Sequence, residues 1–283
     1  MTTPDDMMDA DGVVAGLGLA GPAHAIQLAQ TRFRMRLVEH WRIAPGARVL
    51  EIGCGQGDTT VALAAAVGPD GHVTAIDAAD GGYGAPDTLA DAAERIGRSS
   101  LGGRIGFRFG ADILDPAIPL PHSRYDCAVL AHCSWYFRSA EVLRRTLRRL
   151  GDWTDRLCLS EWDLQPTKPT QIPHLLAVIL QGRMARLDSA FDGNVRTPLS
   201  QAALTAVLRE AGWRVGEAVP VDSTQLQDGR WEVDNGLALL PQPLTAFEAA
   251  PLAGIDMAAL QAVIGSAEIE SLPSFAMTCR RIG

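Results

Sequence analysis

The sequence predicts an α/β protein in which helices cover both faces of a mostly parallel sheet. Two observations lead to this fold class. Short apolar segments alternate with helical segments from residue 48 to 162, which is typical of parallel strands joined by crossover helices. The first apolar segment, 48–52, runs directly into a turn with glycine at alternate positions. The chain of 283 residues, 47% of them hydrophobic, is long enough for one large domain or one domain with an insertion.

Residues 1–44 are predicted to form an N-terminal lid and helix. The segment begins acidic and then becomes rich in glycine. Phe33, Leu37 and Trp41 recur at helical spacing within 23–42, whereas Leu28 falls outside this stripe. Pro45 and Gly46 follow and should end the helix.

Residues 45–165 are predicted to form a cofactor-binding core. We expect strands at 48–52, 72–76, 105–109, 125–131 and 156–162. Helices are expected at 59–67, 88–96 and 141–150. Because the carboxyl ends of parallel strands meet at one edge of a sheet, the residues that follow these strands are the candidates for a ligand site.

The remaining residues, 166–283, are predicted to hold cap helices, a substrate insertion and the last strands of the same domain. The helices are expected at 171–190 and 199–211, and the strands at 214–221 and 275–282. About fifty residues separate these two strands, and a connection that long is more often a functional insertion than a plain loop.

Composition narrows the classes of partner. The formal net charge of -8 argues against nucleic acid, because binding phosphates requires a basic surface. The five cysteines form no Cys-x-x-Cys pair and indicate free thiols in a reducing cytoplasm, not a disulfide framework or a metal site. The acidic start is unlike a signal peptide, and no apolar run approaches the roughly 20 residues that span a membrane. We therefore expect a cytoplasmic protein without metal or membrane contact.

The glycine-rich turn carries the clearest functional signal. Glu51 is followed by Gly53, Gly55 and Gly57, which allow a sharp turn and a close approach of a ligand to the backbone. A carboxylate at Glu51 suits a ligand that carries a cation. The competing dinucleotide pattern, Gly-x-Gly-x-x-Gly, needs its third glycine at position 58, where Asp58 would repel a pyrophosphate. A glycine turn without a ligand is the structural alternative.

This run resembles the first motif of the class I S-adenosylmethionine-dependent methyltransferases, acid-x-Gly-x-Gly-x-Gly. The resemblance implies a Rossmann-like, seven-stranded sheet with S-adenosylmethionine as cofactor and no metal. In that family, acids after the second and third strands hold the ribose hydroxyls and the adenine amino group. The matching residues are Asp77 and Asp112, with the backbone at Ile113 beside the adenine ring. Asp115 lies close enough to compete with Asp112.

The residues after the fourth strand are candidates for the substrate side. Trp135 and Tyr136 would wall a flat, electron-rich substrate and shield a sulfonium by cation–π contact. Alternatively, Trp135 and Phe137 pack against the next helix. His132 is a candidate general base or substrate-orienting residue, and a structural histidine is the alternative.

Two further segments supply carboxylates. Glu161 lies at the end of the fifth strand, where a carboxylate beside an aromatic wall can have a raised pKa and hold a proton. Trp231 and Glu232 lie in the insertion and would fold over the site as a lid. A surface turn at the sheet edge is the alternative for this segment.

Three longer runs, 130–137, 160–162 and 228–233, are similar to the indole C3-methyltransferases of pyrroloindole alkaloid pathways. This resemblance implies carbon methylation of a small aromatic substrate at indole C3, with ring closure to a pyrroloindoline. Glu161, His132 and Glu232 are then the candidates to accept the indole N–H proton. The protein would be a monomer or a homodimer.

Three alternatives to this function stay open. The first is O- or N-methylation of another small aromatic compound, with His132 as the base. The second is a nicotinamide-dependent dehydrogenase. The third is a non-catalytic module that keeps the cofactor fold.

Overall fold

A computed structural model describes residues 9–19, 21–85, 87–188, 191, 193–239 and 268–283. Five parallel strands form the centre of one sheet: β1 Arg48–Ile52, β2 His72–Ile76, β3 Ile105–Arg108, β4 Cys127–Ala131 and β5 Arg156–Trp162. β8 Ser274–Arg281 pairs antiparallel with β5. The strand order is β3-β2-β1-β4-β5-β8-β6, which confirms the predicted mostly parallel sheet.

The register of the strands gathers the predicted site at one edge. Ile52 at the end of β1 is level with Ile76 of β2 and with Leu130 of β4. Ala131 pairs with Ser160, near the end of β5. The turn after β1, the acid after β2 and the loop after β4 therefore leave the sheet side by side.

The outer edge of the sheet differs from the single strand expected at 214–221. Two short strands, β6 Trp213–Val215 and β7 Val219–Val221, pair with opposite ends of β8. The break falls at Gly216, whose backbone N–H donates to the carbonyl of Thr278. A Cβ on Gly216 would lie 2.6 Å from that carbonyl oxygen, so glycine permits the close approach at this point.

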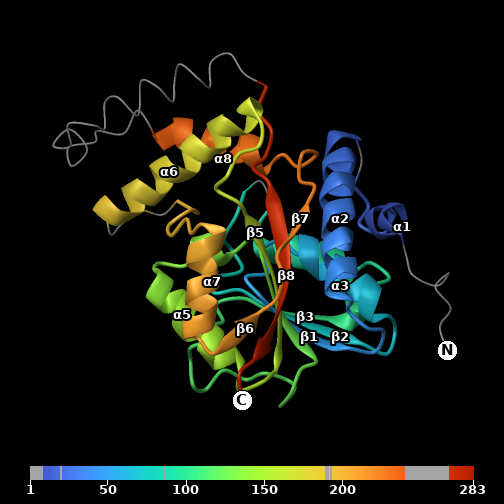
Figure 1. Cartoon of the computed structure of the whole chain (residues 1–283). Helices are drawn as coiled ribbons and strands as arrows, with labels where there is room; N and C mark the ends of the chain where they lie inside the picture. The colour runs from blue at the N-terminus through green and yellow to red at the C-terminus, as the bar shows by residue number, and fades with distance from the viewer. Residues whose placement is uncertain (1–8, 20, 86, 189–190, 192, 240–267) are drawn as a thin grey trace.

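Helices cover both faces of the sheet (Figure 1). One face carries α1 Ala10–Ala15, α2 Gly21–Trp41 and α3 Asp58–Val67, while α5 Ala140–Leu150 and α7 Gln201–Glu210 cover the other. α4 Leu89–Gly97 packs Ile96 into the same core as α2 and α3. The predicted stripe of α2, Phe33, Leu37 and Trp41, is fully buried in that core. This stripe holds α2 against α3 and the sheet.

Two further helices stand at the end of the sheet where β5 finishes and β8 begins (Figure 1). They are α6 Ile172–Leu187 and α8 Asp228–Leu239, and they pack against each other. The segment 228–233, expected as a lid or a surface turn, is the start of α8. The rest of the predicted insertion, 240–267, and residues 1–8 of the predicted lid lie outside the described residues. Among the described helices, none has the length and apolar character needed to cross a membrane.

Candidate functional site

The turn between β1 and α3 provides an open space beside the backbone. Gly53, Gly55 and Gly57 all have positive φ, at +70°, +51° and +91°. A Cβ on Gly53 would lie 2.8 Å from Cβ of Cys133, and one on Gly57 would lie 2.6 Å from Cδ1 of Ile96. A Cβ on Gly55 would meet no atom of the described residues within 4 Å. Packing thus requires the outer two glycines, while the middle one borders space that a ligand can fill.

Glu51 connects the two elements on either side of this turn, β1 and α3. Its side chain is 2% exposed and accepts a hydrogen bond of 2.6 Å from Oγ1 of Thr60 on α3. Burial raises the pKa of Glu51 to about 8, although the Thr60 hydroxyl and the charge of Arg34 lower it. With this pKa the carboxyl group is mostly protonated near neutral pH, and a bound cation would favour its ionised form.

Asp77 joins the end of β2 to the glycine turn. Its carboxylate accepts from the backbone N–H of Gly55 and of Ala79, each at 2.9 Å. The carbonyl of Asp77 accepts from the N–H of Ala111, which ties it to the loop after β3. In that loop Asp112 is exposed, whereas Ile113 is buried at 3%. The structure therefore brings Asp77 to the turn and places Asp112 on the adjoining loop.

His132 follows β4 and is enclosed by aromatic rings. It is 7% exposed and has a φ of +50°, which is uncommon for a side-chain-bearing residue. Its ring stacks on Trp162 with centroids 4.3 Å apart and on Phe33 with centroids 5.3 Å apart.

Both ring nitrogens of His132 have hydrogen-bond partners. Nδ1 lies 2.5 Å from the guanidinium of Arg34, and Nε2 lies 2.9 Å from Oγ of Ser274. Because arginine only donates, Nδ1 must accept and Nε2 must carry the proton. Burial, followed by the charge of Arg34, lowers the pKa of His132 well below its ordinary value. The ring is thus neutral, and its lone pair is already engaged.

Glu161 is held rigidly at the end of β5. The side chain is fully buried, and its carboxylate accepts from the N–H and Oγ of Ser134, at 2.9 and 2.6 Å, and from the N–H of Trp162, at 3.0 Å. Burial raises the pKa of Glu161 to about 7, against the lowering effect of these hydrogen bonds. Near neutral pH this carboxyl group can therefore either accept or release a proton.

The predicted aromatic residues lie in different surroundings. Trp135 is 1% exposed and donates from Nε1 to the carbonyl of Leu199, so it packs in the core. Tyr136 is 40% exposed, and Trp231 on α8 is 45% exposed. Although the residue as a whole is 40% exposed, desolvation of its hydroxyl group raises the pKa of Tyr136 well above its ordinary value, and the charges of Glu232, Asp228 and Glu161 raise it further.

Three polar residues without a predicted role, Gln30, Gln181 and Asp228, complete the surroundings together with Glu232. Asp228 accepts at 2.7 Å from Nε2 of Gln30 on α2, and Glu232 accepts at 2.6 Å from Nε2 of Gln181 on α6. Asp228 and Glu232 are four residues apart, a spacing that places both side chains on one face of a helix. This spacing is the sequence signal by which the pair could have been predicted. Gln30 and Arg34 carry the same spacing, as buried polar residues of α2.

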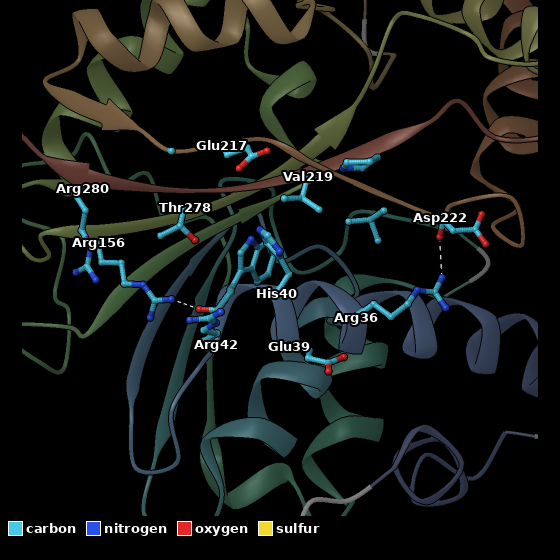
Figure 2. A pocket seen from close by; sticks show the side chains of 14 residues that line it. Arg36, Glu39, His40, Arg42, Arg156, Glu217, Val219, Asp222, Thr278 and Arg280 are labelled. Atoms are coloured by element: carbon cyan, nitrogen blue, oxygen red, sulfur yellow. Dashed lines mark hydrogen bonds between the residues drawn. The ribbon is translucent and has the colours of Figure 1, made fainter.

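A separate groove of about 790 Å³ lies between α2 and the strands β7 and β8 (Figure 2). Its lining includes Arg36, Arg42, Arg156 and Arg280, and none of the predicted site residues belongs to it. Arg156 begins β5, so this groove lies away from the carboxyl end that carries Glu161. Within the described residues, no group of three or more His, Cys, Asp or Glu side chains is placed to hold a metal ion.

Known proteins share this architecture. Residues 49–155 match the family model described as a methyltransferase domain. A cyclopropane-fatty-acyl-phospholipid synthase-like protein from Lactobacillus casei superposes with a TM-score of 0.85 and 33% sequence identity. That match covers 96% of this chain and 98% of the other.

Two curated relatives match a smaller part of the chain. Methyltransferase phomM of Diaporthe leptostromiformis is 28% identical over 204 residues, which are 59% of this chain and 53% of the relative. A demethylmenaquinone methyltransferase of Symbiobacterium thermophilum is 29% identical over 142 residues, 50% of this chain and 48% of the relative. The chain thus spans about half the length of the curated relatives that it matches.

Proposed function

Because this chain belongs to the S-adenosylmethionine-dependent methyltransferases, we propose that it transfers the cofactor's methyl group to a small, electron-rich aromatic compound. The acceptor that we propose is carbon 3 of an indole, with ring closure to a pyrroloindoline. The observation that carries the proposal is the glycine turn, with open space at Gly55 and its 2.9 Å hydrogen bond to Asp77.

The chain's own residues fit this cofactor. A residue with a Cβ at position 55 would fill the space beside the backbone, and Asp77 keeps lone pairs for the ribose hydroxyls. Asp112 is exposed and would accept from the adenine amino group, with the backbone at Ile113 beside the ring. When bound, S-adenosylmethionine supplies an already activated methyl group on a sulfonium, so the protein has to bind, orient and exclude water.

Tyr136 and Trp231 are the aromatic residues that we assign to the substrate. Both present a large exposed surface, whereas Trp135 supports the loop from the core. An aromatic face beside the sulfonium would stabilise its positive charge by cation–π contact. Holding a flat substrate in line with the methyl group accounts for most of the rate in this scheme.

Glu161 is the base that we propose for the indole N–H proton. Its pKa of about 7 lets the ionised form accept a proton at neutral pH, and three hydrogen bonds fix its position. The Ser134 hydroxyl, 2.6 Å from this carboxylate, offers a relay toward the substrate. Glu232, whose pKa burial also raises, is the second candidate. His132 is left out of the scheme, since Arg34 already occupies its lone pair.

The test is to incubate the protein with methyl-labelled S-adenosylmethionine and tryptamines, phenols or aryl amines, and to locate the label by NMR. We expect label on a quaternary carbon at indole C3. Label on oxygen or nitrogen would replace the proposed acceptor with the O- or N-methylation alternative. Tight binding of S-adenosylhomocysteine without transfer to any probe would favour the non-catalytic module.

A further inference from the structure

A buried hydrogen-bond acceptor without a partner lies at the junction of α2 and α8. Gln30 is 4% exposed, and its Nε2 donates to Oδ2 of Asp228 over 2.7 Å. This bond fixes the amide beside the carboxylate and leaves Oε1 of Gln30 with no partner among the described residues. An unpaired buried carbonyl is costly, so such a group in a functional region points to a missing donor.

The surroundings of this acceptor are strongly acidic. Glu232 lies one helical turn after Asp228. Burial raises the pKa of both carboxyl groups, and the charge of Asp228 raises the pKa of Glu232 further. Gln181 donates to Glu232 but brings no positive charge. The charge of Arg34 lowers the pKa of Asp228 and so offsets part of this acidity, whereas the two groups that lower the pKa of Glu232, Gln181 and Asn235, are neutral.

The junction lies on the substrate side of the proposed site. Arg34, one turn after Gln30 on α2, hydrogen-bonds to Nδ1 of His132, the residue that directly follows β4. In the same loop, the charges of Glu232, Asp228 and Glu161 add to the effect of desolvation in raising the pKa of Tyr136. Gln27, one turn before Gln30 on α2, donates to Asp58 at the start of α3, directly after the glycine turn. The unpaired carbonyl and the carboxylates are therefore close to both the loop after β4 and the turn after β1.

A protonated amine matches these groups in both hydrogen bonding and charge. An ammonium has donors and no acceptor, so it would satisfy Oε1 of Gln30 and neutralise the neighbouring carboxylate. A hydroxyl could satisfy the carbonyl but would add no positive charge beside the two carboxylates. We propose that Gln30, Asp228 and Glu232 form a subsite for a protonated amine on the side chain of the aromatic substrate. For ring closure, the amine would give up a proton to one of these carboxylates before its nitrogen attacks C2. This inference rests on the proposed function for the location of the substrate, and it narrows the substrate class to arylalkylamines.

The test is a binding measurement that does not require turnover. Tryptamine and tryptophol, which carry an ammonium and a hydroxyl on the same indole side chain, are titrated into the complex with S-adenosylhomocysteine by calorimetry. We expect tryptamine to bind at least about tenfold more tightly, as for a buried hydrogen bond to a charged group. Asp228→Asn removes one of the two carboxylates and should lower that preference, while it leaves the affinity for tryptophol unchanged. An unchanged preference would overturn the subsite.

Asp234→Asn is the matched control, because Asp234 lies on the same helix but pairs with Arg230 and is 51% exposed. It should keep the full preference for tryptamine. Equal binding of the two probes to the unmodified protein would overturn the subsite, whether or not methyl transfer occurs. The subsite would also be overturned if Asp228→Asn lost as much affinity for S-adenosylhomocysteine as for tryptamine, since the carboxylate would then hold the cofactor's amino group. Tight tryptamine binding without methyl transfer would instead contradict the proposed function alone.

Discussion

Gly55 allows the effect of backbone strain on stability to be measured separately from the effect on ligand binding. Gly46, in the turn before β1, also has positive φ, +79°, and free space where a Cβ would lie. Alanine at either position should therefore strain the backbone and lower the unfolding free energy by a similar amount, about 1–2 kcal/mol. Only Gly55→Ala should weaken S-adenosylhomocysteine binding, by at least about tenfold because the methyl occupies ligand space. Urea unfolding and calorimetry measure the two effects, and equal affinities in both variants would place the cofactor elsewhere.

Glu51 predicts a dependence of stability on pH. Its pKa is about 8 in the folded protein against an ordinary 4.5, so between these values the folded state keeps a proton that the unfolded state has lost. Stability conferred by this group is thus greatest at low pH and falls as the pH rises toward 8, by up to about 1.4 kcal/mol per pH unit. Glu51→Gln should reduce this slope in urea unfolding between pH 5.5 and 7.5.

Two features of that experiment sharpen it. Glu161, with a pKa of about 7, contributes a slope of the same sign, so Glu51→Gln should leave part of the dependence in place. Glu94→Gln is the matched control, since Glu94 is 64% exposed. This variant should leave the slope of unfolding free energy against pH unchanged. An identical slope in Glu51→Gln and the unmodified protein would contradict a buried carboxyl with a raised pKa.

At the scale of elements, His132 joins the loop after β4 to α2, β5 and β8. It follows β4, bonds Arg34 of α2 and Ser274 of β8, and stacks on Trp162 of β5. His132→Ala should lower the unfolding free energy by about 2–4 kcal/mol, because it leaves a cavity and unpairs buried polar groups. His40→Ala, a change at a half-buried position of α2, provides the comparison in urea unfolding. Unchanged stability with abolished methyl transfer would instead indicate the predicted general base.

The strands were predictable because buried parallel strands need mostly apolar segments, such as 48–52 and 72–76. The start of α8 was not predicted as a helix. Gly229 and Gly236 lower its intrinsic helix propensity, and its contacts with α6, far away in sequence, stabilise it instead. The break at Gly216 likewise depends on the approach of β8, which the local sequence does not reveal.

The site was predictable to the extent that it follows the ends of strands. Asp77 and Glu161 come directly after or at the end of apolar segments, so a sheet places them at one edge. Gln30 and Asp228 were given no role, because they are 198 residues apart and only the packed fold joins them. Helical spacing also does not tell which polar residue of α2 is buried, as Gln30 and Arg34 are. The catalytic, substrate and cofactor roles of the predicted residues stay predictions.

For the whole molecule, the glycine motif and the alternation of elements led to a family that the comparisons confirm. The parts of the chain that would select a substrate, α2, α6 and α8, lie outside the matched segment 49–155. Family membership therefore supports the cofactor more directly than it supports the aromatic acceptor. A fold of this kind hosts many substrates, so the acceptor has to be argued from side chains at the site.

A crystal structure of the complex with S-adenosylhomocysteine would test the central claim most directly, that the cofactor binds at the carboxyl edge of the sheet. We expect the ribose hydroxyls on Asp77, the adenine amino group at Asp112 and the sulfur directed toward Tyr136. Binding in the groove lined by Arg42 and Arg156, or at any place without contact to the glycine turn, would contradict the account.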